Sequence, residues 1–131
     1  MLRSITIALV AAAAIVLAAG CGGDDETLII RIHYSRFGPA VIQAQAGEPL
    51  TLRLENDDPI EHEWIVGDEA VHAMHRTGTH AAHDEIPTEV TVPALSEKLT
   101  TVTFHAPGEY KFICHLPGHE AYGMIGVVRV R

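Results

Sequence analysis

Hydrophobic and polar residues alternate along much of this chain with a period of two. The clearest example is the segment 50–55, in which Leu50, Leu52 and Leu54 alternate with polar residues. Such alternation is typical of a β-strand with one face in a hydrophobic core. Short apolar or β-branched segments of the same kind recur at 27–34, 41–45, 62–66, 89–92, 99–104, 110–114 and 126–130.

Turn-forming residues separate these segments at intervals. They include Gly38-Pro39, Gly47-Glu48-Pro49, Asp57-Asp58-Pro59 and Pro107-Gly108. Glycine and proline at such positions interrupt strands and let the chain reverse direction. Seven or eight short strands spaced in this way predict an all-β fold, a Greek-key antiparallel β-sandwich.

One long segment, residues 67–87, does not follow the strand pattern. Asp68 is a good helix N-cap and Gly78 a good stop, which predicts a short helix over 69–77. His72 and His75 would share one face of that helix. The whole histidine-rich insertion carries His72, His75, His80 and His83. These four residues either bind an accessory ion, a second copper or a zinc, or are solvated polar residues on an excursion of the chain.

The N-terminus has the pattern of an export signal. Arg3 precedes an apolar run from residue 5 to residue 19, which is too short for a convincing transmembrane span. The run ends in Leu17-Ala-Ala-Gly-Cys21, which resembles the lipobox of bacterial lipoproteins. Cleavage before Cys21 would leave a lipidated cysteine as a membrane anchor. The alternative is an ordinary cleaved signal in which Cys21 is incidental.

This pattern predicts three parts of the chain. Residues 1–20 are the signal peptide, residues 21–26 are the lipidated cysteine and a flexible tether, and residues 27–131 form one domain. We expect the protein to be exported and held by its lipid at the outer face of the cell membrane or in the periplasm.

The acidic balance of the chain limits its partners. It has 9 Lys and Arg against 17 Asp and Glu, a net charge of −8. Loss of Arg3 with the signal would leave 8 basic and 17 acidic residues, so the mature charge is −9. This charge argues against nucleic acid or an anionic lipid surface as a partner, and it is compatible with a cationic or neutral protein.

The two cysteines point to metal chemistry. If Cys21 carries lipid, Cys114 has no partner for an internal disulfide, and a solitary thiol in an oxidising compartment is vulnerable unless it is buried or ligated. His119 and Met124 follow Cys114 within one short segment, and His62 is a further candidate upstream. A thiolate, imidazoles and a thioether suit copper, and two His, one Cys and a weak axial Met form an electron-transfer site.

These residues resemble a known family. The segment Tyr110-x-Phe112-x-Cys114, the later His119 and Gly123-Met124, and Asn56 ahead of His62 resemble the cupredoxins, the blue copper proteins of the plastocyanin and azurin type. The resemblance covers about residues 28–131. It implies one type 1 copper, with His62, Cys114 and His119 as equatorial ligands and Met124 as the axial one.

The resemblance also implies a function. Cupredoxins transfer single electrons between redox proteins, so the expected partner is a cytochrome or an oxidase and the expected state is monomeric. The competing function is a copper chaperone, scavenger or resistance protein that uses the histidine-rich insertion. We do not expect an enzyme, because the sequence contains no evident Ser-His-Asp set, paired catalytic carboxylates or phosphate-binding Gly loop.

Two positions depart from related patterns. Multicopper oxidases place a histidine on each side of the cysteine, whereas here Ile113 precedes it and only His115 follows, which argues against an oxidase. His115 is expected to be a solvent-side histidine. Cupredoxins commonly carry Asn after the first ligand histidine, where this chain has Glu63, so the contacts around the ligands are expected to differ there.

Overall fold

The computed structural model describes residues 27–78 and 86–131. The predicted signal peptide at 1–20, the tether at 21–26 with Cys21, and the loop residues His80 and His83 lie outside the described residues. Within the described ranges, no helix is long and apolar enough to cross a membrane.

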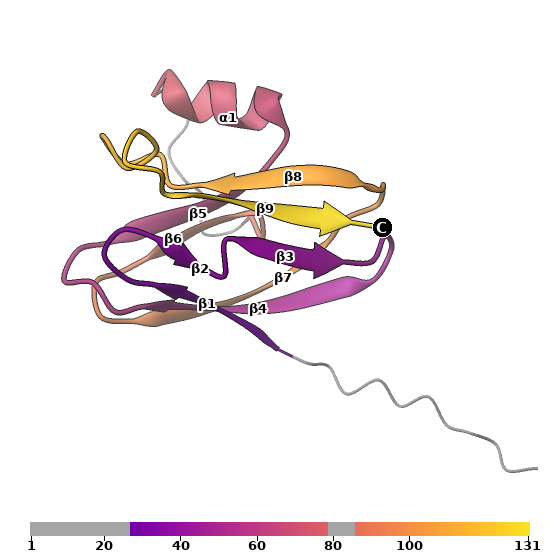
Figure 1. The fold of residues 1–131 in the computed structure, drawn as a ribbon, viewed down its shortest axis with the longest axis horizontal. Coiled ribbons are helices and arrows are strands. Elements are labelled where there is room, and N and C mark those ends of the chain that lie inside the picture. The colour runs from indigo at the N-terminus through magenta and orange to yellow at the C-terminus, as the bar shows by residue number, and fades with distance from the viewer. Residues whose placement is uncertain (1–26, 79–85) are drawn as a thin grey trace, which may run out of the picture.

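The described part of the domain contains nine strands and one helix (Figure 1). A four-stranded sheet has the order β2-β1-β4-β7, and a five-stranded sheet has the order β3-β9-β8-β5-β6. The bounds are β1 Leu28–Ile32, β2 Phe37–Gly38, β3 Val41–Ala44, β4 Pro49–Asn56, β5 His62–Gly67, α1 Glu69–Arg76, β6 Glu89–Val92, β7 Glu97–Thr103, β8 Gly108–Ile113 and β9 Ile125–Val130.

The predicted β-sandwich is confirmed, and its pairing is mixed. Strands β4 and β7, β5 and β6, β5 and β8, β8 and β9, and β1 and β2 are antiparallel, while β1 pairs with β4 and β3 pairs with β9 in parallel. The two-residue strand β2 is the one that the sequence pattern did not distinguish. The hydrophobic alternation is the same for either direction of pairing, so it could not predict the two parallel ladders.

The core lies between the two sheets. Leu52 and Leu54 of β4 are fully buried, as their alternation predicted. Across the sandwich, Phe112 lies between Phe37 and Trp64, with ring centroids 5.2 Å and 6.1 Å away. Phe112 is the last residue but one of β8, so this aromatic packing supports the segment that begins at Cys114.

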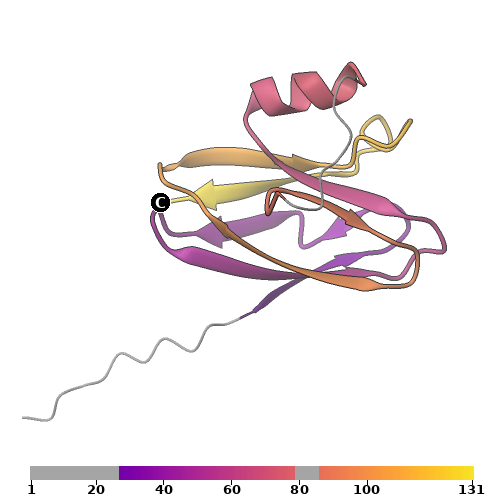
Figure 2. The ribbon, with the colours of Figure 1, turned by 180° about the vertical axis from the view of Figure 1, so that it is seen from behind.

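Helix α1 forms as predicted and packs on the outer side of the five-stranded sheet (Figures 1 and 2). The side chain of Asp68 accepts a hydrogen bond from the N–H of Val71, which caps the helix N-terminus. The helix turns His72 and His75 inward, and both are buried. Packing against β5 therefore places two histidines between the helix and the sheet.

Candidate metal centre

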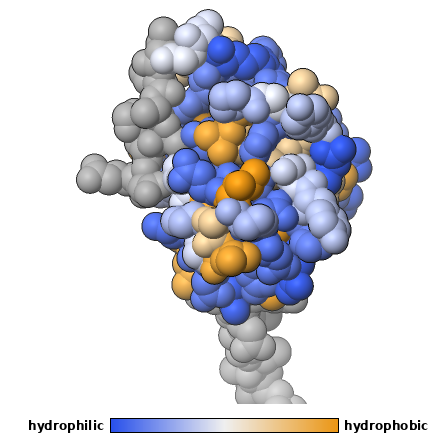
Figure 3. Space-filling view, turned by 90° about the vertical axis from the view of Figure 1, so that its left-hand side faces the viewer, coloured by the Kyte–Doolittle hydropathy of each residue, from blue (hydrophilic) through white to orange (hydrophobic). Residues whose placement is uncertain are grey.

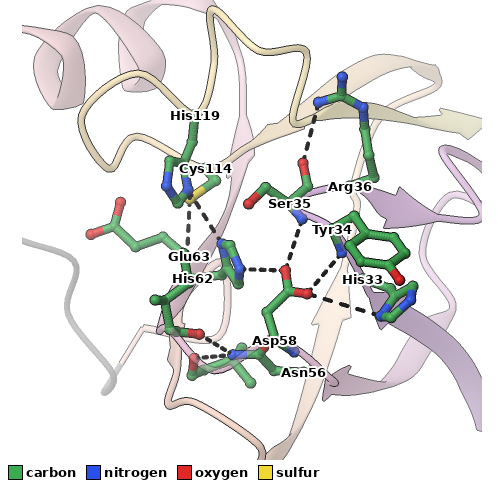
Figure 4. Close-up of polar contacts among 12 residues, drawn as sticks. His33, Tyr34, Ser35, Arg36, Asn56, Asp58, His62, Glu63, Cys114 and His119 are labelled. Carbon is green, nitrogen blue, oxygen red and sulfur yellow. Dashed lines mark hydrogen bonds and ion pairs between the residues drawn. The ribbon is translucent and has the colours of Figure 1, made fainter.

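The start of one strand and a single connection between two others bring the candidate ligands together at one end of the sandwich (Figure 4). His62 begins β5, Cys114 follows the last residue of β8, and His119 lies in the connection between β8 and β9. The Nδ1 atom of His119 is 3.3 Å from Nδ1 of His62 and 3.2 Å from Sγ of Cys114. One donor atom from each of the three residues lies within 4.8 Å of the other two. Because β5 and β8 are paired neighbours, the sheet itself fixes the approach of His62 to the cysteine.

The fourth candidate, Met124, is the last residue of the connection 114–124 between β8 and β9, which we call the ligand loop. Its N–H donates to the carbonyl of His119 at 3.0 Å, and its own carbonyl accepts from the N–H of Cys114 at 3.2 Å. The side chain is fully buried in the core, next to β9. Gly118 and Gly123 adopt left-handed φ values of 84° and 85°, which favour glycine and let the loop turn twice in ten residues. The backbone thus fixes Met124 to both Cys114 and His119.

A buried carboxylate orients His62. The Nε2 atom of His62 lies 2.9 Å from Oδ2 of Asp58, which leaves Nδ1 facing the other donors. The two carboxylate oxygens of Asp58 also accept the backbone N–H groups of Tyr34 and Ser35, each at 2.7 Å (Figure 4). Burial by itself would raise the pKa of Asp58, but these N–H groups and His62 lower that pKa overall. A charged Asp58 holds the N–H of His62 on Nε2, the arrangement found behind metal-binding histidines.

Asn56 holds the loop that carries Asp58. Its buried Nδ2 donates to the carbonyls of Ile60, Val92 and Pro93 at 2.8, 3.1 and 2.9 Å. Its Oδ1 accepts the N–H of Asp58 at 3.0 Å. One side chain therefore fastens the segment between β4 and β5 to the end of β6.

Glu63 links the two ligand segments. Its N–H donates to Sγ of Cys114 at 3.4 Å, and its carboxylate accepts the N–H of His115 at 3.2 Å. Burial raises the pKa of Glu63, although the hydrogen bond from His115 opposes this effect. Glu63, which stands where cupredoxins commonly have asparagine, thus makes polar contacts between β5, which carries His62, and the ligand loop.

Two of the four histidines of the insertion, His72 and His75, are buried and not solvated. His72 and His75 lie against His115, which follows Cys114, while His80 and His83 lie outside the described residues. The expectation that His115 faces solvent was wrong, because helix α1 covers it and leaves its side chain 3% exposed. Asp58 was also missed as a partner of His62, and its only sequence signal is its position four residues earlier in a turn.

The donor set fits a soft metal ion that can gain or lose one electron. One buried thiol, one buried imidazole and one partly exposed imidazole converge, and a buried thioether lies at the end of the same loop, a combination that favours copper over the harder metals. Burial raises the pKa of Cys114, although the N–H groups of Glu63 and Leu116 lower it in part. Burial and the neighbouring His62 lower the pKa of His119. The metal-free site at neutral pH therefore holds a thiol and a neutral His119.

Proton release on metal binding follows from this protonation state. Binding of the first copper at pH 7 should release about one more proton from the unsubstituted protein than from a Cys114→Ala variant, because the thiol must ionise while His119 has no proton to lose. The measurement is a titration with an indicator dye in weakly buffered solution. Equal proton release from the two proteins would show that the thiol was already ionised before copper bound.

Comparisons with known proteins agree with this geometry. Residues 5–127 match the family model of the cupredoxin-like domain. The chain is 34% identical over 99 residues to the copper-resistant cuproprotein CopI of Rubrivivax gelatinosus, an alignment that covers 73% of this chain and 60% of that protein. It is also 30% identical over 148 aligned positions to Auracyanin-A of Chloroflexus aurantiacus, covering 90% of this chain and 91% of that protein.

The solved structures give the same result. The structure of auracyanin A, described as a "blue" copper protein from the same green thermophilic photosynthetic bacterium, superposes with a TM-score of 0.66 at 25% identity. The superposition covers 81% of this chain and 98% of that one. Because the family model spans most of the chain and a full-length relative aligns with it, this protein belongs to the cupredoxin family.

Proposed function

We propose that the protein holds one type 1 copper and transfers single electrons between redox partners. His62, Cys114 and His119 would bind the copper in the equatorial positions and Met124 would bind it axially. The observation that carries the proposal is the convergence of Nδ1 of His119 with Nδ1 of His62 at 3.3 Å and with Sγ of Cys114 at 3.2 Å, with one donor atom of each residue within 4.8 Å of the other two. The full-length likeness to Auracyanin-A supports it.

Rigid placement of the ligands is what the chain contributes to electron transfer. Bound copper supplies the one-electron redox couple. The carboxylate of Asp58 fixes the ring of His62, the N–H of Glu63 fixes the sulfur of Cys114, and the loop hydrogen bonds fix His119 relative to Met124. Ligands held in this way by contacts outside the site need little rearrangement when the charge changes, which lowers the barrier to transfer.

His119 is the proposed exit for the electron. Cys114, His62 and Met124 are fully buried, whereas His119 is partly exposed. Leu116, Pro117 and Tyr122 flank it on the ligand loop. Figure 3 faces this end of the sandwich and shows apolar groups set among polar side chains. A small, partly apolar surface of this kind suits a partner that must dissociate quickly.

Substitution at this surface gives a test of the exit route. We expect Leu116→Glu to slow electron self-exchange between copies of the protein by roughly tenfold, since the encounter must desolvate two carboxylates, one from each copy, and a cost of about 1.4 kcal/mol corresponds to that factor. Self-exchange is measured from NMR line widths in mixtures of reduced and oxidised protein, at high salt to screen net charge. Leu99→Glu is the matched control, because Leu99 is 67% exposed on β7, outside the ligand loop.

The visible spectrum separates docking from damage in that experiment. Leu116→Glu should leave the copper absorption unchanged, which shows that the ligand loop is intact. Equal self-exchange rates for Leu116→Glu and the unsubstituted protein would contradict the assignment of this surface as the exit route.

Copper handling is the second candidate function. The likeness to a copper-resistant cuproprotein favours it, although this chain spans 60% of the length of that relative. Equilibrium dialysis and voltammetry separate the two functions. A carrier holds one strongly coloured copper with reversible redox, whatever else it binds, whereas a storage or delivery protein takes up several copper ions, none of which has that colour.

Export and anchoring complete the proposal. A lipid on Cys21 would tether the domain to the membrane face where its partners lie, and the acidic surface would favour a cationic or neutral protein there. Mass spectrometry of the N-terminal peptide from membranes tests the anchor, since a diacylated Cys21 is expected and an unmodified one would exclude it.

A further inference from the structure

A second pair of histidines faces each other beside the candidate metal centre. His72 of α1 and His115, the residue after Cys114, approach with Nδ1 of His72 3.0 Å from Nε2 of His115. His72 is fully buried, and the side chain of His115 is 3% exposed. The pair joins the helix to the end of β8, which lie side by side in Figures 1 and 2.

The outer nitrogens of both rings face oxygen atoms. Nε2 of His72 lies 3.2 Å from the carbonyl oxygen of Lys111, and Nδ1 of His115 lies 3.6 Å from Oε2 of Glu120. A carbonyl only accepts hydrogen bonds, so Nε2 of His72 carries the hydrogen and Nδ1 presents its lone pair to His115. A hydrogen on Nδ1 of His115 would be directed at Glu120. In a neutral ring, Nε2 of His115 would then carry a lone pair that faces the lone pair on Nδ1 of His72.

When both rings are neutral and no metal lies between them, one of these contacts is lost. A hydrogen placed between the two rings leaves the bare Nδ1 of His115 against the carboxylate of Glu120. A cation between the rings satisfies both inner lone pairs and both outer contacts together. The same arrangement occurs at the ligand site, where the inner nitrogens of His62 and His119 are 3.3 Å apart and the outer nitrogen of His62 faces Asp58. Outer carbonyl and carboxylate partners of this kind are typical of metal-binding histidines.

We propose that His72 Nδ1 and His115 Nε2 bind a second metal ion, Cu(II). Two bonds of about 2.0 Å to imidazole nitrogens would span the separation of 3.0 Å at an angle of about 97°. An angle near 90° is that of adjacent ligands in the tetragonal geometry that Cu(II) prefers. Water would complete the coordination. This proposal goes beyond the electron-transfer function and does not depend on it.

The surroundings of the pair favour a cation. Glu120 lies beside His115, and Glu63 accepts the backbone N–H of His115. Glu89 lies 3.3 Å from Nε2 of His75, whose ring stacks on that of His115 with centroids 5.6 Å apart. Arg76 offsets one of these charges by donating to Glu120. Three carboxylates against one guanidinium leave a negative local balance around the rings.

The test is the second equivalent of Cu(II) added to the full mature chain. The first equivalent should give the thiolate-dependent visible band. The second should add no intense visible band, and its EPR signal should show hyperfine splitting from imidazole nitrogen. His72→Gln and His115→Gln should each weaken binding of the second equivalent by at least about tenfold while His72→Gln keeps the visible band. His105→Gln, an exposed histidine at the opposite end of β8, should bind both equivalents normally.

Two results would overturn the proposal. One is a second equivalent that binds His72→Gln and His115→Gln as tightly as the unsubstituted protein. The other is a second equivalent lost only in a His80→Gln, His83→Gln double variant, which would place the ion elsewhere on the insertion. The visible band reports the first site separately, so failure of one site does not imply failure of the other.

Discussion

Replacing Cys114 with serine should abolish the intense visible absorption of the copper-loaded protein. That absorption arises from charge transfer between a thiolate and Cu(II), and Cys114 is the only cysteine within 4.8 Å of the imidazole nitrogens of His62 and His119 among the described residues. A serine hydroxyl is a hard, protonated donor that does not replace a thiolate on copper. The measurement is an optical and EPR titration of both proteins with Cu(II).

The control for this experiment is a check that Cys114→Ser still folds. Serine is close to cysteine in size, so circular dichroism of Cys114→Ser should match that of the unsubstituted protein. An intense band that persists in Cys114→Ser would show that the colour comes from another ligand set, and the assignment of the sulfur would then be wrong.

Asn56→Ala should lower the free energy of unfolding by about 3 kcal/mol. Alanine removes the donor for three carbonyls and the acceptor for the N–H of Asp58, and each buried polar group left unpaired costs roughly 1–3 kcal/mol. The loss is measured by urea denaturation of the metal-free protein. Gln43→Ala, at an exposed position of β3, is the control and should change stability by less than about 0.5 kcal/mol.

The same variant should also weaken copper binding. Asn56 holds the loop whose Asp58 orients His62, so loosening that loop frees the ring of a ligand. A destabilisation below about 1 kcal/mol would mean that water replaces the lost hydrogen bonds. The segment between β4 and β5 would then be held mainly by its packing.

The parts of the fold that depend on local pattern could be predicted from the sequence. Leu52 and Leu54 are buried because a period of two places them on one face of a strand. The helix formed within one residue of its predicted C-terminal bound because Asp68 caps it and Gly78 follows it. The parallel pairing of β1 with β4 and of β3 with β9 was not predictable, since strands distant in sequence carry no local signal of direction.

The candidate site divides in the same way. Cys114, His119 and Met124 could be identified because their spacing and chemistry are specific, and the structure places them on one loop. The role of Asp58 depends on two backbone N–H groups from the connection between β1 and β2, which no local pattern brings near. The burial of His115 depends on how α1 lies over β8, so its exposure could not be inferred from its neighbours in sequence.

The most direct test that His62, Cys114 and His119 bind one copper ion is X-ray absorption at the copper edge of the protein loaded with one equivalent of metal. If the three residues bind the ion as proposed, the first coordination shell contains one short copper–sulfur bond and two imidazole nitrogens. A shell of nitrogen and oxygen atoms alone, with no sulfur at bonding distance, would contradict the proposed binding of copper by these residues.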